Sequence, residues 1–386
     1  MRWRPLIWCV YCMSISRCGG VRSPDLPRRS CGMVLTRAPS LCPMTAKWVD
    51  GDRAGADGGE ASVVVGVDAG GTSTRSVVVT LDGACLGLGR SGAANPVSSG
   101  IDRAMEAITS SVLTALGDVP AAAVEVVVLA AAGGANRPEV AGRLQAELAA
   151  RGVNAPVELA ADGFAAFCSG TADDAGCALV AGTGAVALRV SGGEVTRVAD
   201  GLGWLLGDGG SGFWMGRRVV RAALAELDGR GEATALTPAL LTALGMAERY
   251  PGSTVLGRSR IVADLLGRLY EEPTIALARF SGLAVQHPAD AVAAGILADA
   301  SRELAATLGA VLEPGSLGPV VMGGGLLAGS RELREGIVAA LGDRLAGHSV
   351  VVVPDGLAGA AVIALRRAGV EVDDSVLGSL RRGLDR

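Results

Sequence analysis

The chain has 386 residues, of which 49% are hydrophobic and 3% aromatic, and its formal net charge is −4. This length predicts two domains, with cores built from Val, Leu and Ala rather than from aromatic rings. The acidic balance and the lack of a basic tract argue against nucleic-acid binding. The only lysine is Lys47, which excludes mechanisms that need a lysine on the phosphates, such as a P-loop or a protein kinase.

Residues 1–60 differ in composition from the rest of the chain. They hold five of the eight cysteines and three of the five tryptophans, with Arg, Pro and Ser scattered and no apolar period. An export signal is one interpretation of the apolar residues 6–13, but this run is short. We expect a disordered leader, with Met33 or Met44 as the start of the working protein.

The other three cysteines, Cys85, Cys168 and Cys177, lie far apart in apolar surroundings. They are predicted to be reduced core residues, which favours a cytoplasmic location. No run of apolar residues long enough to cross a membrane follows residue 60, so no membrane partner is expected. A homodimer is one option for the assembly.

Residues 63–79 predict a strand, a tight glycine turn and a second strand. Gly70 and Gly71 let the chain reverse without a Cβ atom in the way. The carboxylate of Asp68 ends the first strand beside bare backbone amides and hydroxyl groups, and this combination can cradle a Mg²⁺-phosphate group. A hairpin with a polar tip is the alternative interpretation.

The rest of the first half alternates between strands and helices. Apolar spacing predicts a helix that Gly117 closes, and Asn136 followed by Pro138 marks another helix start. Gly152 ends that helix. Further strands are predicted at residues 84–89, 125–129 and 156–160, with a helix at residues 99–116 and another opening at Asp162.

The pattern then restarts. Residues 176–181 predict an apolar strand, residues 182–184 a Gly-Thr-Gly turn, and residues 185–190 and 194–199 two more strands. Because both halves read strand, Gly/Thr turn, strand, Gly turn, strand, we interpret the chain as a duplicated α/β unit. The second copy carries a predicted helical insertion. Two such domains would leave a cleft in which the two turns can grip a nucleotide from both sides.

The predicted helices of the second half span residues 211–227, 238–247, 258–269, 274–285 and 289–312, and the later strands span residues 319–322 and 349–353, each followed by a helix. The predicted domains are residues 61–172 and 173–386. The last helix is expected to pack back on the first domain.

Three motifs in chain order resemble the phosphate-1, phosphate-2 and adenosine motifs of the actin/hexokinase/Hsp70 superfamily: residues 68–74, 182–184 and 323–327. The stretch at residues 201–214, Gly-Leu-Gly-Trp-Leu-Leu-Gly-Asp-Gly-Gly-Ser-Gly-Phe-Trp, resembles the N-acetylglucosamine kinase branch of the BadF/BadG/BcrA/BcrD ATPase family. The similarity begins at about Ser62 and reaches the C-terminus. It implies duplicated ribonuclease-H-like (actin-like ATPase) domains with an interdomain cleft.

The resemblance assigns roles to residues. Asp162 matches the family's general base, which takes a proton from the attacking sugar hydroxyl, whereas a helix N-cap is its alternative role. Asp68 would steady Mg²⁺ through water, since Mg²⁺ sheds its hydration shell reluctantly. The residues expected to bind ATP are Gly70, Gly71, Thr72, Ser73, Gly182, Thr183, Gly184, Gly324 and Gly325.

Sugar contacts are implied for Asn95, Gly203, Trp204 and Asp208. The alternatives are a turn residue for Asn95, a core or hinge residue for Trp204 and a helix cap for Asp208. After Asn95 the chain reads Pro-Val-Ser and lacks a bulky side chain that some relatives use near the amino substituent. This departure leaves open whether N-acetylglucosamine or free glucosamine is accepted.

The expected activity is therefore ATP- and Mg²⁺-dependent phosphorylation of N-acetylglucosamine or glucosamine at the 6-hydroxyl. One alternative is an ATPase that activates a dehydratase or reductase through an iron–sulfur cluster. Cys85, Cys168 and Cys177 show no paired spacing for such a cluster. The other alternative is a non-catalytic sugar-sensing regulator on the same fold, although the leader has no helix-turn-helix pattern.

Overall fold

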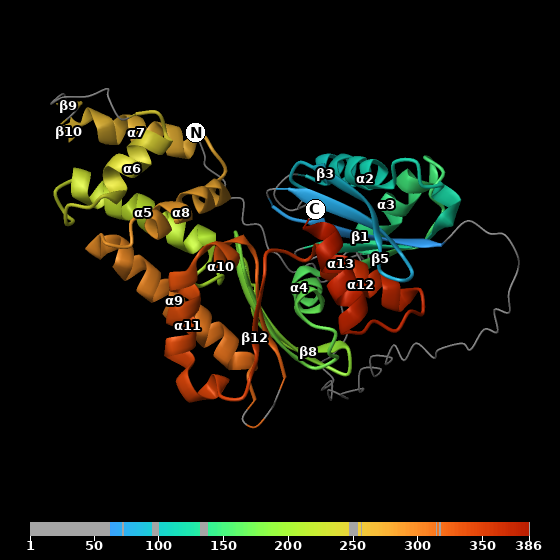
Figure 1. Ribbon diagram of the computed structural model, residues 1–386. Helices are drawn as coiled ribbons and strands as arrows, with labels where there is room; N and C mark the ends of the chain where they lie inside the picture. Colours follow the sequence, from blue (N-terminus) through green and yellow to red (C-terminus); the bar gives the residue numbers. More distant parts are fainter. Residues whose placement is uncertain are drawn as a thin grey trace, which may run out of the picture. The chain divides into compact units, whose positions relative to one another are not determined.

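A computed structural model describes residues 62–71, 73–94, 100–131, 138–246, 254–255, 257–313, 315 and 318–385. These residues belong to one unit, Gly58–Arg386, and the predicted leader lies outside them. They form two five-stranded sheets with helices packed on them, which confirms the α/β prediction (Figure 1). No helix in this part of the chain is both long and apolar enough to span a membrane.

The first sheet has the strand order β3-β2-β1-β4-β5. Its strands are β1 (Val63–Ala69), β2 (Thr74–Thr80), β3 (Cys85–Ser91), β4 (Val124–Ala131) and β5 (Val157–Ala161). β1 pairs antiparallel with β2 and parallel with β4, and β4 pairs parallel with β5. The carboxyl ends of β1, β4 and β5 therefore meet at one edge, so that Asp68 and Asp162 lie along the same edge of this sheet.

Both faces of the first sheet are covered, which explains its nearly continuous valine runs. On one face, Val65 packs with α2 (Ile101–Leu116) and α3 (Pro138–Ala149). On the other face, Val64 packs with α4 (Asp162–Gly170) and α12 (Leu357–Arg367). The one-residue step from Val64 to Val65 thus switches the side chain from one core to the other.

The second sheet has the order β12-β11-β6-β7-β8. Its strands are β6 (Gly176–Ala181), β7 (Ala185–Ser191), β8 (Glu194–Asp200), β11 (Val320–Gly323) and β12 (Val350–Val353). β6 pairs antiparallel with β7 and parallel with β11, as β1 does with β2 and β4. The two sheets share one topology, as the duplicated sequence pattern predicted.

Helices fill the chain between β8 and β11 and share a core of their own. They are α5 (Gly212–Leu227), α6 (Leu236–Ala243), α7 (Arg260–Tyr270), the 3₁₀ helix η3 (Thr274–Phe280), α8 (Ser281–Gln286) and α9 (Ala291–Val311), with a short hairpin of β9 (Thr254–Val255) and β10 (Arg258–Ser259). The single helix predicted at residues 274–285 was wrong. Its first part is a 3₁₀ helix that lies tightly against α5, where a Cβ atom on Gly216 would come within 2.0 Å of the Leu277 carbonyl oxygen. The interpretation of these helices as an insertion stays a prediction.

The remaining elements are short helices after the strands and one terminal helix. They are η1 (Ala121–Ala123), α10 (Gly325–Gly329), α11 (Arg331–Leu341), η4 (Gly342–Leu345) and α13 (Asp374–Leu384). α13 lies against β3 and the turn before it, where a Cβ atom on Gly83 would be 2.9 Å from the Val376 side chain. The end of the chain thus returns to the first sheet, while the predicted boundary at residues 172–173 stays a prediction.

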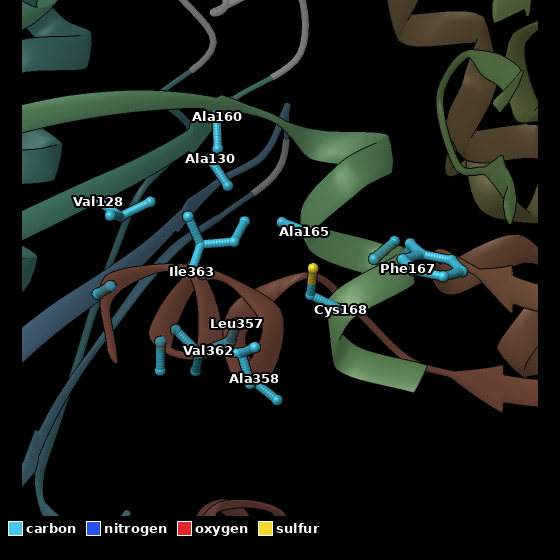
Figure 2. Packing of buried hydrophobic residues seen from close by; sticks show 14 of the residues in the cluster. Val128, Ala130, Ala160, Ala165, Phe167, Cys168, Leu357, Ala358, Val362 and Ile363 are labelled. Atoms are coloured by element: carbon cyan, nitrogen blue, oxygen red, sulfur yellow. The ribbon is translucent and has the colours of Figure 1, made fainter. Parts of the chain in front are cut away.

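One core joins the two sheets. It contains Val64 and Val128 from the first sheet, Leu188 from the second, and the facing sides of α4 and α12. Figure 2 shows Ile363 of α12 beneath the strands of the first sheet, near the residues of α4. Helix α12 can approach β1 this closely because Gly66 has no side chain. A Cβ atom there would lie 2.5 Å from the Ala361 backbone nitrogen.

Candidate active site

Asp68 lies near the end of β1, in contact with a residue from a distant part of the chain. Its Oδ2 accepts a hydrogen bond from the Gly356 N–H (3.4 Å) and lies 3.9 Å from Arg75 Nη2. Arg75 makes its shorter ion pair with Asp355, at 2.8 Å. Arg75 and Asp355 had not been predicted as site residues, although Asp355-Gly356 follows an apolar strand and opens a helix, as Asp162-Gly163 does.

The charge of Asp68 is destabilised in this position. The pKa of its carboxyl is raised to about 6, first by burial and then by the nearby Asp355 and Asp162 carboxylates. Arg75 and the Gly356 N–H oppose this rise. A cation delivered with a nucleotide would relieve the same repulsion, which suits a carboxylate that steadies Mg²⁺.

Asp162 is the first residue of α4, directly after β5. Its Oδ1 accepts a hydrogen bond from the Gly163 N–H (2.9 Å), and burial raises the pKa of the carboxyl above its ordinary 3.8. The alternative role as a helix N-cap was wrong, because the N-cap position is occupied by Ala161 and no side chain caps this end. Asp162 is thus not the N-cap residue, although its Oδ1 holds the Gly163 N–H in the first turn of α4.

The two glycine turns lie close together. A Cβ atom on Gly71 would be 3.7 Å from Thr183 Oγ1, so the first turn approaches the second. Within the first turn, Gly70 N–H donates to the Ser73 carbonyl (3.0 Å). Thr72, another residue predicted to hold the phosphates, lies outside the described residues.

The second turn joins β6 to β7 and is hydrogen-bonded to the start of α5. The Gly182 carbonyl accepts from the Gly212 N–H (2.8 Å) and the Thr183 carbonyl accepts from the Phe213 N–H (3.1 Å). These bonds satisfy donors at the helix N-terminus that have no partner within the helix. The turn is thereby fixed by the backbone of α5.

Asp208 is buried and its side chain reaches the second turn. A Cβ atom on Gly184 would lie 2.8 Å from Asp208 Oδ2. Its backbone has φ +57°, a conformation that is uncommon outside glycine. Burial raises the pKa of its carboxyl, the Asp200 and Asp162 charges raise it further, and a backbone hydrogen bond from Ala185 lowers it.

The loop before α5 is fixed by Asp200, a residue that sequence reasoning missed. Its two carboxylate oxygens accept from the N–H groups of Asp208 (2.8 Å) and Gly209 (3.0 Å). The alternative that Asp208 caps α5 was wrong, because Ser211 is the N-cap and its hydroxyl accepts from the Trp214 N–H. The Asp208 carboxylate is therefore not engaged in capping α5, and its hydrogen bond comes from the Ala185 backbone instead.

The other predicted sugar residues are only partly placed. Gly203 has φ +84°, and its carbonyl accepts from the N–H of Gly207 (2.8 Å), which closes the loop. Trp204 is 42% exposed, and its ring lies 5.4 Å from that of Phe213 in a tilted arrangement, so it is not a core residue. Asn95 lies outside the described residues.

The predicted adenosine motif lies at the carboxyl end of β11. Gly324 has φ +93°, and a Cβ atom there would be 2.5 Å from the Ala181 carbonyl oxygen at the end of β6. Nothing lies within 4 Å of the corresponding position on Gly325. The backbone at Gly325 therefore has open space beside it, and a flat group can approach it there.

A magnesium site made of protein ligands alone is absent from the described part of the chain, where no three or more His, Cys, Asp or Glu side chains are grouped closely enough to hold a metal ion. Asp68 fits Mg²⁺ as a single carboxylate that acts through water, with phosphate oxygens completing the shell. This fits the predicted outer role of Asp68.

Two sheets of one topology, joined by α4 and α12 with their glycine turns adjacent, define a duplicated actin-like ATPase fold. The chain belongs to the BadF/BadG/BcrA/BcrD ATPase family, whose model matches residues 65–364. This confirms the resemblance seen in the sequence.

Individual relatives point to sugar kinases. The N-acetylmuramic acid/N-acetylglucosamine kinase of Clostridium acetobutylicum is 26% identical over 252 residues, 65% of this chain and 79% of the relative. A solved structure from Chromobacterium violaceum, assigned as an N-acetylglucosamine kinase, is 26% identical with a TM-score of 0.63, over 79% of this chain and 100% of that one. Another, from Porphyromonas gingivalis, shares the fold at 21% identity with a TM-score of 0.60, over 80% of this chain and 99% of that one. These relatives agree with the predicted enzyme class, an ATP-dependent sugar kinase.

Proposed function

We propose that the protein transfers the γ-phosphoryl group of ATP to an amino sugar, N-acetylglucosamine or glucosamine, at its 6-hydroxyl. The observation that carries this proposal is the position of Asp162. It follows β5 at the sheet edge that also carries Asp68, it holds no helix cap, and it lies near enough to Asp68 and Asp208 for their charges to interact.

Asp162 would act as the general base. A raised pKa suits this role, because a base is most effective when its pKa lies near the working pH. Its Oδ1 is oriented by the Gly163 N–H, and the carboxylate would accept the proton of the sugar hydroxyl as that oxygen attacks phosphorus. General-base help of this kind contributes roughly 10²–10⁴-fold in rate.

The two turns would position the phosphates. Gly71 and Thr183 lie close enough for one phosphate chain to touch both turns, and Gly70 exposes a backbone free of Cβ. Mg²⁺, held through water by Asp68, would neutralise the charge that develops on the transferred group. Gly324 and Gly325 would lie under the adenosine.

Asp208 would accept hydrogen bonds from sugar hydroxyls, and Trp204 would lie against the ring. Because Asp208 also contacts Gly184 of the second turn, the sugar and phosphate sites share one support. The N-acetyl specificity follows from the relatives' names rather than from a described side chain, and Asn95 keeps its predicted contact as part of this proposal.

A coupled assay for ADP release tests the proposal. Wild-type protein with Mg²⁺-ATP is offered N-acetylglucosamine, glucosamine, N-acetylmuramic acid and glucose. We expect turnover with at least one amino sugar, and loss of that turnover in Asp162→Ala with ATP binding retained. Turnover that no sugar stimulates would contradict the kinase assignment.

The ATPase-activator alternative is not favoured by the described cysteines. Cys168 and Cys177 are buried on different elements, α4 and β6, and Cys85 is half-buried on β3. All three are free thiols. No pair of cysteines in the described residues is exposed to hold a cluster.

A further inference from the structure

A cavity of about 690 Å³ lies between α5 and α9, beside the proposed sugar site, with which it shares Trp204. The two helices lie side by side (Figure 1). None of Asp68, Asp162 and Asp208 lines the cavity. Its walls combine three aromatic rings with arginines, among them Trp204, Phe213, Trp214, Arg217, Arg218 and Arg221.

The positive charge in this cavity is only partly balanced. Arg218 forms an ion pair with Asp299 (2.7 Å) and lies over the ring of Trp214, 4.5 Å from its centroid. Arg217 and Arg221 are four residues apart on α5, are exposed, and make no hydrogen bond or ion pair to any residue that the structure describes. Like charges at this spacing repel each other along a helix, so an anion between them would be attracted to both.

A fourth arginine adds to this surplus. Arg230 also lines the cavity, and it is paired with Asp228 (3.0 Å), outside the lining. Within the lining, Asp299 is the acidic residue set against four arginines in a protein whose net charge is −4. The lining of the cavity is thus positively charged, whereas the chain as a whole is negatively charged.

The aromatic wall connects the cavity to the sugar loop. Trp204 lines the cavity, is 42% exposed and packs against Phe213, whose backbone N–H binds the Thr183 carbonyl. Four residues after Trp204 comes Asp208, which reaches the second turn. An occupant that contacts Trp204 therefore contacts the loop that carries the proposed sugar ligand.

We propose that this cavity binds a small sugar that carries one anionic group, a phosphate or a carboxylate. Arg217 and Arg221 bind the anion, and Trp204 forms the wall of the cavity that belongs to the sugar loop. The planar guanidinium group donates two parallel hydrogen bonds to either kind of anion, which suits both chemistries. The choice of a sugar rests on the proposed function, whereas the anion follows from the arginines alone.

The anionic group can come from two kinds of molecule. The anion can belong to the substrate, in which case the cavity extends the sugar site to accept an acidic substituent. It can instead belong to a phosphorylated sugar that binds while the substrate site is occupied, in which case the cavity regulates the enzyme through the Trp204–Asp208 loop.

Isothermal titration calorimetry tests the site with two probes, N-acetylmuramic acid for the carboxylate and N-acetylglucosamine 6-phosphate for the phosphate. At least one probe is expected to bind wild-type protein, and Arg217→Ala/Arg221→Ala is expected to weaken that binding about tenfold or more. Arg103→Ala is the matched control, because Arg103 is an exposed helical arginine on α2 without a partner among the described residues. The control should bind the probes as wild type does.

Arg217→Lys/Arg221→Lys keeps the charge but loses the planar fork, and is expected to bind with intermediate affinity. This variant also serves if the alanine variant does not fold. Unchanged affinity in both double variants, or no binding of either probe to wild-type protein, would overturn the proposal.

Competition distinguishes the two sources. Displacement of N-acetylmuramic acid by saturating N-acetylglucosamine places the anion on the substrate. Simultaneous binding of N-acetylglucosamine and its 6-phosphate identifies a separate regulatory site, and both results uphold the anion site. If no sugar stimulates ADP release while an acidic probe still binds through Arg217 and Arg221, the kinase proposal fails and this inference stands.

Discussion

The glycine turns after β1 and β6 occupy equivalent places in two sheets of the same topology, yet they are held in different ways. Beside the first turn, the Asp68 carboxylate meets Arg75 and the Gly356 N–H. At the second turn, the carbonyls accept from the N–H groups of Gly212 and Phe213 at the start of α5, and the Asp208 carboxylate fits closely against Gly184.

This difference shows that the duplicated strands determine where the two turns lie but not which residues hold them. The repeated strands place both turns at the same edge of their sheets, but each turn takes its partners from residues that follow much later in the chain. The first turn depends on charge, and therefore responds to pH and to cations. The second depends on steric fit, and therefore responds to a single added methyl group.

The largest effect is expected from Asp162, whose charge acts on the carboxylates beside both turns, Asp68 and Asp208. Asp162→Asn removes the base without changing its size and should lower kcat by roughly 10²–10⁴-fold, while calorimetry still shows ATP binding. Asp374→Asn is the matched control, because Asp374 is also the first residue of a helix but is exposed on α13. A kcat within twofold of wild type for Asp162→Asn would remove Asp162 as the base.

The second prediction separates the turns by steric fit. Gly184→Ala places a methyl group 2.8 Å from Asp208 Oδ2, whereas Gly71→Ala places one 3.7 Å from Thr183 Oγ1, an ordinary contact. Displacing Asp208 should raise KM for the sugar by about tenfold, equivalent to about 1.4 kcal/mol. Gly71→Ala should instead raise KM for ATP, because its methyl group lies on the proposed phosphate side.

Steady-state kinetics, with first the sugar and then ATP as the varied substrate, measure these two KM values for each variant. Thermal unfolding of both variants shows whether either change is a general loss of stability. An unchanged KM for the sugar in Gly184→Ala would contradict the proposed support of Asp208 by the second turn.

The third prediction concerns the charges at the first turn. Asp355→Asn breaks the 2.8 Å ion pair with Arg75, and since Arg75 is partly exposed the loss should be about 0.2–1 kcal/mol. A double-mutant cycle with Arg75→Gln, measured by urea denaturation, isolates this pair. A coupling energy of zero would mean that the ion pair does not hold the first turn.

The smallest effect is expected from pH. Burial raises the pKa of Asp162 above 3.8, and a base acts only when it is ionised. The value of kcat/KM should therefore be lost as pH falls through this raised pKa, so that the acidic limb lies above the ordinary range of an aspartate. A pH profile that stays flat down to the ordinary aspartate pKa would show that Asp162 does not titrate as the base.

Local pattern predicted the strands of the two five-stranded sheets and most helices, because each relies on its own apolar spacing, whereas the short hairpin of β9 and β10 was not predicted. Strand β1 and helix α2 were predicted to within a few residues. Residues 274–285 were mispredicted as one helix, because the 3₁₀ turn depends on the close approach of α5 at Gly216. The last helix was expected to pack back on the first domain, but the bounds of α13 were not predicted.

The candidate site was predictable where a carboxylate or glycine turn follows a strand, as at Asp68, Asp162 and Gly182. Arg75, Asp200 and Asp355 were missed, because their partners become neighbours only in the folded chain. Asp355 carried a usable signal, an Asp-Gly pair between an apolar strand and a helix. The arginines of α5 carried none, since exposed arginines on an amphipathic helix are the ordinary case.

The position of α12 has a consequence for the order of synthesis. The strands of the first sheet leave the ribosome early, but the helix that covers one of their faces, Leu357–Arg367, comes near the end of the chain. Until it emerges, Val64 and Val128 have no partner from α12. The first half therefore cannot complete its folding as an independent unit during translation, and the nascent chain must be kept from aggregating until the last helices are made.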